Sequence, residues 1–528
     1  MIKKRMGRLQ TSFSGFKNIF NIKLNGVAVS LLALLFLIVL RRAWVSDDAF
    51  ITMRTVDNFV NGYGLTWNVA ERVQAYTHPL WMFLLIPIYF LLREPFYTFL
   101  ILGIGLTMLA AFQLLRRHQH ELWIVVILAV VLSLSRAFVD YSTSGLENPL
   151  SHLMIALFAY EYLNSWEKSD RKSILRLSLL ASLGMLNRID LGLLFLPALV
   201  AILLRYKKWD GLIQALLGFL PLILWEVFSV IYYGFPFPNT AYAKLGHSFN
   251  SFVVIKQGLV YLIHSLSHDP LTILVIFLPI VLWFGSTNHV KILPLVLGVL
   301  LSLAYVIAIG GDFMSGRFLT PAFFLSLLLL GEMLPPFEER AKLVLLAFVL
   351  ILGFSIPYHT LTLDVAEPKY STASIDDERI YFFDGAALAT RVQNAMTVNF
   401  KWAKQGTEYQ QTGYHVTHAR AIGFFGYYVG QKVYVIDGHG LADPLLARLP
   451  VQGSFGFTAG HSLKLLPKGY RDSLNSGKNE ITDASIAAYY DKLTLITRGV
   501  LFDPARWQAI WEINTGKLNY LLHADYEQ

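Results

Sequence analysis

The chain has 528 residues, of which 55% are hydrophobic and only 15% are charged. Soluble globular proteins carry roughly a quarter of charged residues, so this composition, with a mean hydropathy of +0.49, excludes an ordinary soluble enzyme. The absence of cysteine excludes disulfides, thiolate catalysis and thiolate metal sites. The formal net charge of +8 does not indicate a nucleic-acid partner, because loop Lys and Arg residues orient membrane proteins.

The first apolar run, 24–44, follows a basic N-terminal segment. A secretory signal peptide would end in small residues at a cleavage site, whereas this run ends in Arg41, Arg42 and Trp44. We therefore expect an uncleaved signal anchor whose N-terminus lies in the cytoplasm.

Long apolar runs recur over the first two thirds of the chain, and a helix of roughly 17–25 residues crosses a bilayer. The predicted spans are 24–44, 96–115, 122–138, 146–164, 173–187, 190–204, 211–233, 270–286, 291–309, 318–334 and 341–357. The sequence thus predicts an all-α polytopic membrane bundle of about eleven spans over residues 1–357, with a large first outer loop at 45–95.

A further apolar run, 79–92, is short for a crossing. Counting it as a span would move Arg116, Arg117 and the basic loop at 205–209 to the outside, against the positive-inside rule. We therefore expect 79–92 to lie along the outer interface or to dip into it, which leaves the C-terminus outside the cell.

The chain becomes polar and mixed from about Tyr358, and the remainder has the size of one soluble domain. The run 431–437 predicts a strand and 483–493 predicts a helix, so residues 358–528 are expected to form an α+β extracytoplasmic domain. Trp507 and Trp511 can belong to its core or anchor it at the membrane interface, and the core is the more common outcome.

Two adjacent carboxylates, Asp47 and Asp48, stand where the chain leaves the first span. They can be solvated acids, with one of them capping a helix that begins at Ala49. A turn at 61–64 and the polar residues at 71–78 crowd the same loop. This density of hydrogen-bonding groups favours a functional loop.

Further charged residues fall at span ends on the same outer side. Ionisable groups at membrane depth are costly and so indicate function. The cations there run against the positive-inside tendency, and they can pair with the acids or bind an anion such as a lipid phosphate. The acids are Glu147, Asp190 and Asp312, and the cations are Arg188, Lys244 and Arg317.

Structural alternatives remain for several of these residues. Arg188 and Asp190 can form a local pair that holds a helix end, and Lys244 can extend to the membrane interface. For the set as a whole, the residue types suit group transfer at the membrane surface. A carboxylate removes a proton from an acceptor hydroxyl, and cations stabilise a phosphate leaving group.

These segments carry a resemblance to the GT-C class of integral membrane glycosyltransferases. Within that class the chain most resembles the terminal arabinofuranosyltransferase group and its Gram-negative relatives. The resemblance rests on the order and number of segments spread over nearly the whole chain, which are "SDDAFITMRTVDNFVNGYGLTWN", "ERVQAYTHPLW", "TSGLEN", "LNRID", "FPNTAYAK", "GGDFMSGRFLTP", "VIDGHGLADPLLARLP" and "GHSLKLLPKGY".

The resemblance implies a bundle with an external domain in the bacterial inner membrane. It implies inverting transfer of arabinofuranose or a related pentose from a polyprenyl-phosphate donor in the lipid bilayer. The acceptor would be a cell-envelope glycan, a lipopolysaccharide or a surface protein. By motif, Asp47 takes the position of the base, with Asp48 beside it. The expected substrate-binding residues are His78, Glu147, Arg188, Asp190, Asn239, Lys244, Asp312 and Arg317.

Asp437 and His461 in the C-terminal segment also match the family's segments, although a lone histidine more often has a structural role. Two positions depart from the family pattern, Ile189 where relatives commonly have proline and His439 where they have a small or apolar residue. Some GT-C enzymes use a metal, and Asp47, Asp48 and Glu147 offer oxygen ligands for Mg²⁺ or Ca²⁺. Because a monophosphate can leave with cations alone, we expect no obligatory metal, and a divalent cation such as Mg²⁺ or Ca²⁺ stays an alternative.

Two other functions fit parts of the sequence. A transporter or flippase would place its ionisable residues near the bilayer midplane, often within inverted repeats, and no repeat is evident. A non-catalytic envelope assembly protein would use the external domain for docking, but it would not need the acidic first loop.

Overall fold

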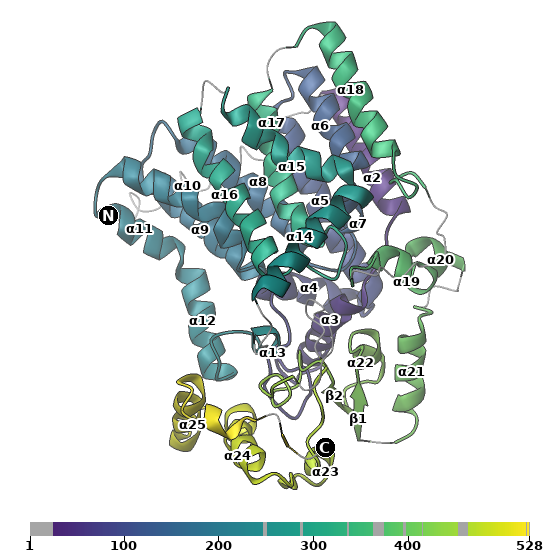
Figure 1. Cartoon of the computed structure of the whole chain (residues 1–528), viewed down its shortest axis with the longest axis vertical. Helices are drawn as coiled ribbons and strands as arrows, with labels where there is room; N and C mark the ends of the chain where they lie inside the picture. The colour runs from purple at the N-terminus through teal and green to yellow at the C-terminus, as the bar shows by residue number, and fades with distance from the viewer. Residues whose placement is uncertain are drawn as a thin grey trace, which may run out of the picture.

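A computed structural model of the chain describes residues 25–245, 251–285, 289–334, 337–362, 374–393, 398–413, 415–451, 463–523 and 525–526. Helices make up 68% of the structure, so the predicted helical architecture is confirmed. Figure 1 shows a bundle of helices at one end and a smaller C-terminal region at the other, with α3 and α4 between them. The basic N-terminal segment and His461 lie outside the described residues.

The bundle is built from helices that follow the predicted spans closely. Every predicted span falls on one or two of these helices, and α14 is the one that the sequence analysis missed. They are α2 (Gly26–Arg41), α5 (Pro95–Arg117), α6 (Leu122–Leu134), α7 (Arg136–Asp140), α8 (Asn148–Ser165), α9 (Arg171–Asn187), α10 (Leu191–Tyr206), α11 (Asp210–Gly218), α12 (Leu220–Tyr232), α14 (Ser251–His268), α15 (Pro270–Trp283), α16 (His289–Ala308), α17 (Thr320–Met333) and α18 (Glu339–Phe354).

The apolar helices identify a membrane protein, but few of them are long. Within the described ranges, α5 and α16 alone are long and apolar enough to cross a bilayer as single helices. Two pairs reach that length only when joined, α11 with α12 at a 54° bend and α14 with α15 at a 113° bend. These give two to four spans by length and composition, and the count of eleven stays a prediction.

The bend between α11 and α12 differs from the single straight span expected at 211–233. Pro221 lies in the first turn of α12, where it has no N–H to continue the hydrogen bonding of α11. Gly218 is the last residue of α11 and packs closely on α9. A Cβ atom at this position would lie only 2.5 Å from Cβ of Ser178, so a larger residue would not fit there. The first turn of α12 stays on α9, where the N–H of Leu222 donates to the hydroxyl of Ser182, and α12 extends toward the C-terminal region (Figure 1).

The first outer loop contains α3 (Asp47–Val60) and α4 (Pro79–Leu92). The side chain of Ser46 caps α3 by accepting a hydrogen bond from the N–H of Ala49. The expectation that an acid caps this helix is therefore wrong, and both acids lie in its first turn. The run at 79–92 is helical, as expected, and Pro79 takes the first-turn position that suits proline.

The C-terminal region is mostly helical, with one two-stranded parallel sheet in its described part. The strand expected at 431–437 is found as β2, and the helix expected at 483–493 is found as α24, with Asp483 as its cap. The elements are α19 (Glu378–Ala386), α20 (Leu388–Gln393), α21 (Lys401–Gln410), β1 (Val416–Ala419), α22 (Phe424–Tyr428), β2 (Tyr434–Asp437), α23 (Tyr470–Ser476), α24 (Ala484–Arg498) and α25 (Pro504–Asn514).

The two tryptophans of α25 have different environments. Trp507 is partly buried against the core formed by α23, α24 and α25. Trp511 is 62% exposed, so the expectation of a core position is wrong for this residue.

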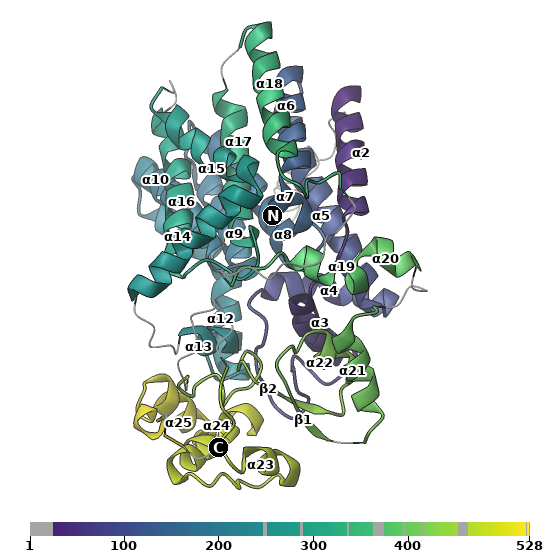
Figure 2. The ribbon, with the colours of Figure 1, turned by 45° about the vertical axis from the view of Figure 1, so that its right-hand side comes forward.

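The first outer loop packs directly on the C-terminal region, as both views show (Figures 1 and 2). The buried Arg54 of α3 donates hydrogen bonds to the carbonyl oxygens of Gly426 and Val433. The side-chain amide of Asn68 donates a hydrogen bond to the carbonyl oxygen of Val435, and its oxygen accepts one from the N–H of Val435. Asn68 therefore binds the main chain of β2 as a neighbouring strand would. These contacts fix the position of the C-terminal region relative to the start of α3. A domain boundary at 357/358 stays a prediction.

Candidate functional site

Asp47 lies at the seam between the first outer loop and the C-terminal region. Its two carboxyl oxygens accept hydrogen bonds from the main-chain N–H groups of Gly423, at 3.0 Å, and Phe424, at 2.6 Å, where α22 begins. Burial raises the pKa of Asp47 to about 7, against the effect of these two donors. The side chain predicted as the base therefore also joins two parts of the fold.

Asp48 is the neighbouring acid, and its surroundings differ. It is half-buried, and its side chain makes no hydrogen bond or ion pair with any residue in the described ranges. Burial raises the pKa of Asp48, while the charges of Arg317 and Lys244 act in the opposite direction. Of the two acids, Asp48 has the carboxylate oxygens that are available to a substrate.

Glu147 is the centre of a buried group of charges. Its Oε1 atom lies 2.8 Å from Nη1 of Arg188 and 3.2 Å from Nη2 of Arg317. Its Oε2 atom lies 3.4 Å from Nδ1 of His78. The Glu147 side chain is only 2% exposed, so it needs these partners to remain charged.

Two more predicted residues extend this group at its ends. Asp190 binds Arg188 with both oxygens, at 3.0 and 2.8 Å, which is the local pair considered from the sequence. Asp312 lies 3.6 Å from the guanidinium of Arg317. The Phe318 ring lies beside both guanidiniums, at 4.7 Å from Arg188 and 5.6 Å from Arg317. The outer loops therefore bring these charges together as one chain of alternating sign.

His78 connects this charge group to α3. Its Nε2 atom lies 2.7 Å from the hydroxyl oxygen of Thr52, one turn after Asp48. Burial lowers the pKa of His78 to about 4, so the imidazole is neutral near pH 7 and contributes a hydrogen bond rather than a charge.

Asn239 lies away from this charge group. Its amide donates to the main-chain oxygens of Gly440 and Asp443, at 2.9 and 3.0 Å, and its oxygen accepts a hydrogen bond from Arg448. This position suits a docking contact between the start of α13 (Asn239–Leu245) and the C-terminal region. Lys244 is exposed near the end of α13, and its charge reaches both Asp48 and Asp312.

A cavity of about 310 Å³ opens beside Asp47 and Asp48. Its walls come from the start of α3, the segment around α19, the start of α21, the turn before α22 and the turn after β2. The lining residues are Asp47, Asp48, Ile51, Phe313, Asp376, Glu378, Tyr381, Phe382, Trp402, Arg420, Ala421, Ile422, His439 and Leu441. Acids and aromatic rings predominate in it.

Much of this cavity was not foreseen from the sequence. The polar stretch that contains Glu378 was read only as the start of a soluble domain. The adjacent acids in "IDDER" were the available signal, because they repeat the pattern of the first outer loop. Asp437, considered as a site residue, lies just beyond the lining. It accepts hydrogen bonds from the N–H groups of His439 and Ala442 and so shapes the turn that carries His439 into the cavity.

Sequence comparison identifies two curated relatives, both named terminal beta-(1->2)-arabinofuranosyltransferase. The protein of Corynebacterium glutamicum is 26% identical over 385 residues, which cover 65% of this chain and 56% of the relative. The protein of Mycobacterium tuberculosis is 28% identical over 224 residues, which cover 39% of this chain and 35% of the relative. The chain is a relative of these glycosyltransferases. The aligned part spans about half or less of their length.

No protein-family model matches the chain, and no solved structure matches it. The relationship to the two arabinofuranosyltransferases therefore rests on sequence similarity, and the similarity agrees with the family resemblance of the outer-loop segments.

The three acids considered as metal ligands do not come together as a ligand set. Both oxygens of Asp47 accept main-chain hydrogen bonds, and Glu147 pairs with Arg188 and Arg317. Among the described residues, no group of three His, Cys, Asp or Glu side chains is arranged to hold a metal ion.

Gly423 allows α22 to approach Asp47. A Cβ atom at this position would overlap the main-chain oxygen of Asp47 and lie 2.7 Å from its Cγ atom. We expect Gly423→Ala to separate α22 from α3 and to cost about 1–3 kcal/mol of stability, the usual range for overpacking. Thermal unfolding in detergent measures this change. Gly105→Ala is the control, because no atom lies within 4 Å of a Cβ there, and equal unfolding temperatures for the two variants would contradict the expected clash.

Proposed function

We propose that the chain transfers arabinofuranose or a related pentose from a polyprenyl-phosphate donor to a glycan of the bacterial cell envelope, with inversion at the anomeric carbon. One observation carries the proposal. Asp48 lines the cavity and has no hydrogen-bond partner in the described structure. The positive charges of Arg317 and Lys244 act on its carboxylate and lower its pKa against the effect of burial. A base and a binding site for an anionic leaving group are therefore adjacent.

The reaction assigns a role to each side of this arrangement. The acceptor hydroxyl oxygen attacks the anomeric carbon, and the bond from that carbon to the phosphate oxygen breaks. The electron pair of the broken bond leaves with the polyprenyl phosphate, whose negative charge Arg317 and Lys244 stabilise. The hydroxyl proton passes to the Asp48 carboxylate, and Asp47 holds the start of α3 in place.

Two features support a lipid-linked donor. Arg317 follows the end of α16, one of the helices long enough to cross the bilayer, and Lys244 is exposed near the end of α13. A phosphate at the membrane surface would therefore meet both cations while its lipid remains in the bilayer. The names of the two relatives support arabinofuranose as the sugar. The orientation with the cavity facing the periplasm follows from the positive-inside rule.

The test is transfer of labelled pentose from a synthetic polyprenyl-phosphate arabinofuranose donor to an oligosaccharide acceptor. Membranes that contain the full chain are compared with membranes that contain the double variant Asp47→Asn/Asp48→Asn. Transfer that depends on the intact pair supports the proposal. If wild-type membranes transfer no more sugar than membranes without the protein, the proposed function is wrong.

The pH dependence of transfer provides a second check. Burial raises the pKa of Asp47 to about 7 and also raises the pKa of Asp48, and two adjacent acids titrate as a coupled pair. The base must be ionised to accept a proton, so the rate is expected to rise with pH over a range above the ordinary pKa of a carboxyl group and then to level off. Asp47→Asn removes a like charge, and the rising limb is expected to move to lower pH. A rate that falls as pH rises over this range would contradict the assignment of Asp48 as the base.

A further inference from the structure

Glu378 is a buried acid that the proposed reaction does not use. It is the first residue of α19 and lines the same cavity as Asp48. Its side chain is buried, with the residue only 9% exposed, and makes no hydrogen bond or ion pair with any residue in the described ranges. Buried polar groups are nearly always hydrogen-bonded, so an unpaired carboxyl facing a cavity points to a ligand that supplies the partner.

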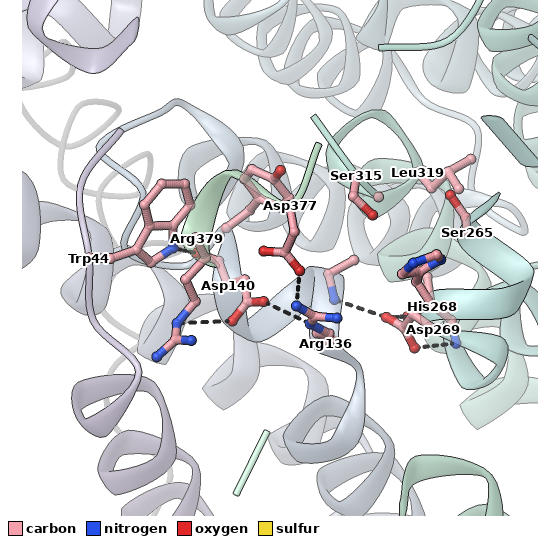
Figure 3. A pocket seen from close by; sticks show the side chains of 14 residues that line it. Trp44, Arg136, Asp140, Ser265, His268, Asp269, Ser315, Leu319, Asp377 and Arg379 are labelled. Carbon is pink, nitrogen blue, oxygen red and sulfur yellow. Dashed lines mark hydrogen bonds and ion pairs between the residues drawn. The ribbon is translucent and has the colours of Figure 1, made fainter. Parts of the chain in front are cut away.

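The two neighbours of Glu378 anchor the start of α19. Asp377 pairs with Arg136, and the guanidinium of Arg379 lies 3.6 Å from Asp140. Figure 3 shows both side chains directed toward Arg136 and Asp140 of α7, which line a separate pocket. Asp377 is the cap of α19 and Arg379 lies in its first turn, so their ion pairs with α7 fix the start of this helix. Glu378, the first residue of that helix, lines the cavity beside Asp48.

The cavity walls have the composition of a carbohydrate site. The rings of Phe313, Phe382 and Trp402 line it together with the carboxyl groups. Sugar rings place their C–H faces on aromatic rings and their hydroxyls on a few polar groups, as small-molecule sites generally do. A volume of about 310 Å³ lies at the lower end of the range for ligand pockets and fits one or two sugar rings.

Glu378 is surrounded mainly by other acids. Burial raises the pKa of Glu378 well above its usual value, and the charges of Asp48, Asp47, Asp376 and Asp312 add to this effect. Across the cavity, Arg420 and His439 are the basic side chains that line it. The guanidinium of Arg379 is paired with Asp140 instead. A neutral carboxyl can donate one hydrogen bond and accept others, which suits an uncharged sugar hydroxyl and not a phosphate.

We propose that this cavity is the subsite for a neutral sugar of the acceptor, in which Glu378 binds a hydroxyl group and the ring packs against Trp402. This proposal rests on the proposed function, because it names where the acceptor of that reaction lies. It places the acceptor hydroxyl near Asp48, while the lipid phosphate remains on the side of Arg317 and Lys244.

Binding without the donor tests the subsite separately from the reaction. The purified full chain in detergent is titrated calorimetrically with four neutral trisaccharides, built from arabinofuranose, mannose, galactose or glucose. At least one is expected to bind wild type. Glu378→Ala is expected to weaken that binding about tenfold, the upper range for one hydrogen bond. Glu378→Gln keeps a donor and an acceptor and is expected to remain within about threefold of wild type.

Asp384→Ala is the matched control, because Asp384 is an exposed acid on the same helix, α19, and it should bind like wild type. The subsite proposal is overturned if no trisaccharide binds wild type, if Glu378→Ala binds as well as wild type, or if the glutamine variant loses as much affinity as the alanine variant. If binding follows the expected pattern but wild type transfers no sugar, the proposed function fails and the sugar subsite stands.

Discussion

Asp48→Asn is expected to lower the rate of sugar transfer by about 100-fold or more, the range for loss of a general base. The amide keeps the size of the side chain but cannot accept the proton of the acceptor hydroxyl. Because Asp48 has no hydrogen-bond partner within the described structure, the substitution should leave the fold intact. Initial rates at saturating donor and acceptor measure the effect, with thermal unfolding of the same samples.

Comparison with Asp47→Asn distinguishes a residue that acts as the base from one that holds the fold. Asp47 accepts two main-chain hydrogen bonds, and an amide group can accept only one of them, while its NH₂ faces the other N–H. Asp47→Asn should therefore lose stability as well as rate, whereas Asp48→Asn should lose rate alone. Transfer by Asp48→Asn at the wild-type rate would show that Asp48 is not the base and would return that role to Asp47.

Glu147→Ala is expected to destabilise the protein by about 3–5 kcal/mol, the usual cost of breaking a buried ion pair. The substitution removes the shared partner of Arg188 and Arg317, so that two guanidiniums face each other with only Asp190 and Asp312 at the outer ends. Thermal unfolding in detergent is the measurement. A shift no larger than that of a surface variant would contradict the view of Glu147 as the centre of the charge group.

Glu167→Ala is the matched control for that experiment. Glu167 lies 3.8 Å from Arg205, and its side chain is 78% exposed. An exposed ion pair contributes about 0–1 kcal/mol, so the control should unfold close to wild type. Added salt should also affect the two sites differently, because screening acts mainly on exposed pairs.

The charged residues of the predicted outer loops could be singled out from the sequence because their signal is local. Cations on the outer side contradict the positive-inside rule, and Arg188 and Arg317 stand out for that reason without knowledge of the fold. Their common partner, Glu147, is 41 residues from one and 170 from the other. That pairing depends on which helices are neighbours, and periodicity does not report it. The catalytic and substrate-binding roles of these residues stay predictions.

The positions of the helices were also predictable from the sequence, whereas the bends between helices and the contact partners of single residues were not. The apolar runs gave the positions of the bundle helices, but they did not reveal the 54° bend after Gly218 or the helix α14. Asn239 illustrates the limit at the level of one residue. Its motif predicted substrate binding, which stays a prediction, and its side chain contacts the main chain around Gly440, about 200 residues away. A polar motif in a loop does not distinguish a ligand contact from a docking contact.

The hydrogen bonds from α22 to Asp47 join residues 376 and 377 positions apart. A chain made from its N-terminus inserts the first helices long before residues 423 and 424 leave the ribosome. Asp47 can reach its final geometry only after these two residues have been made and α22 has packed against α3. An unfinished chain would therefore lack the contacts that hold the proposed site together.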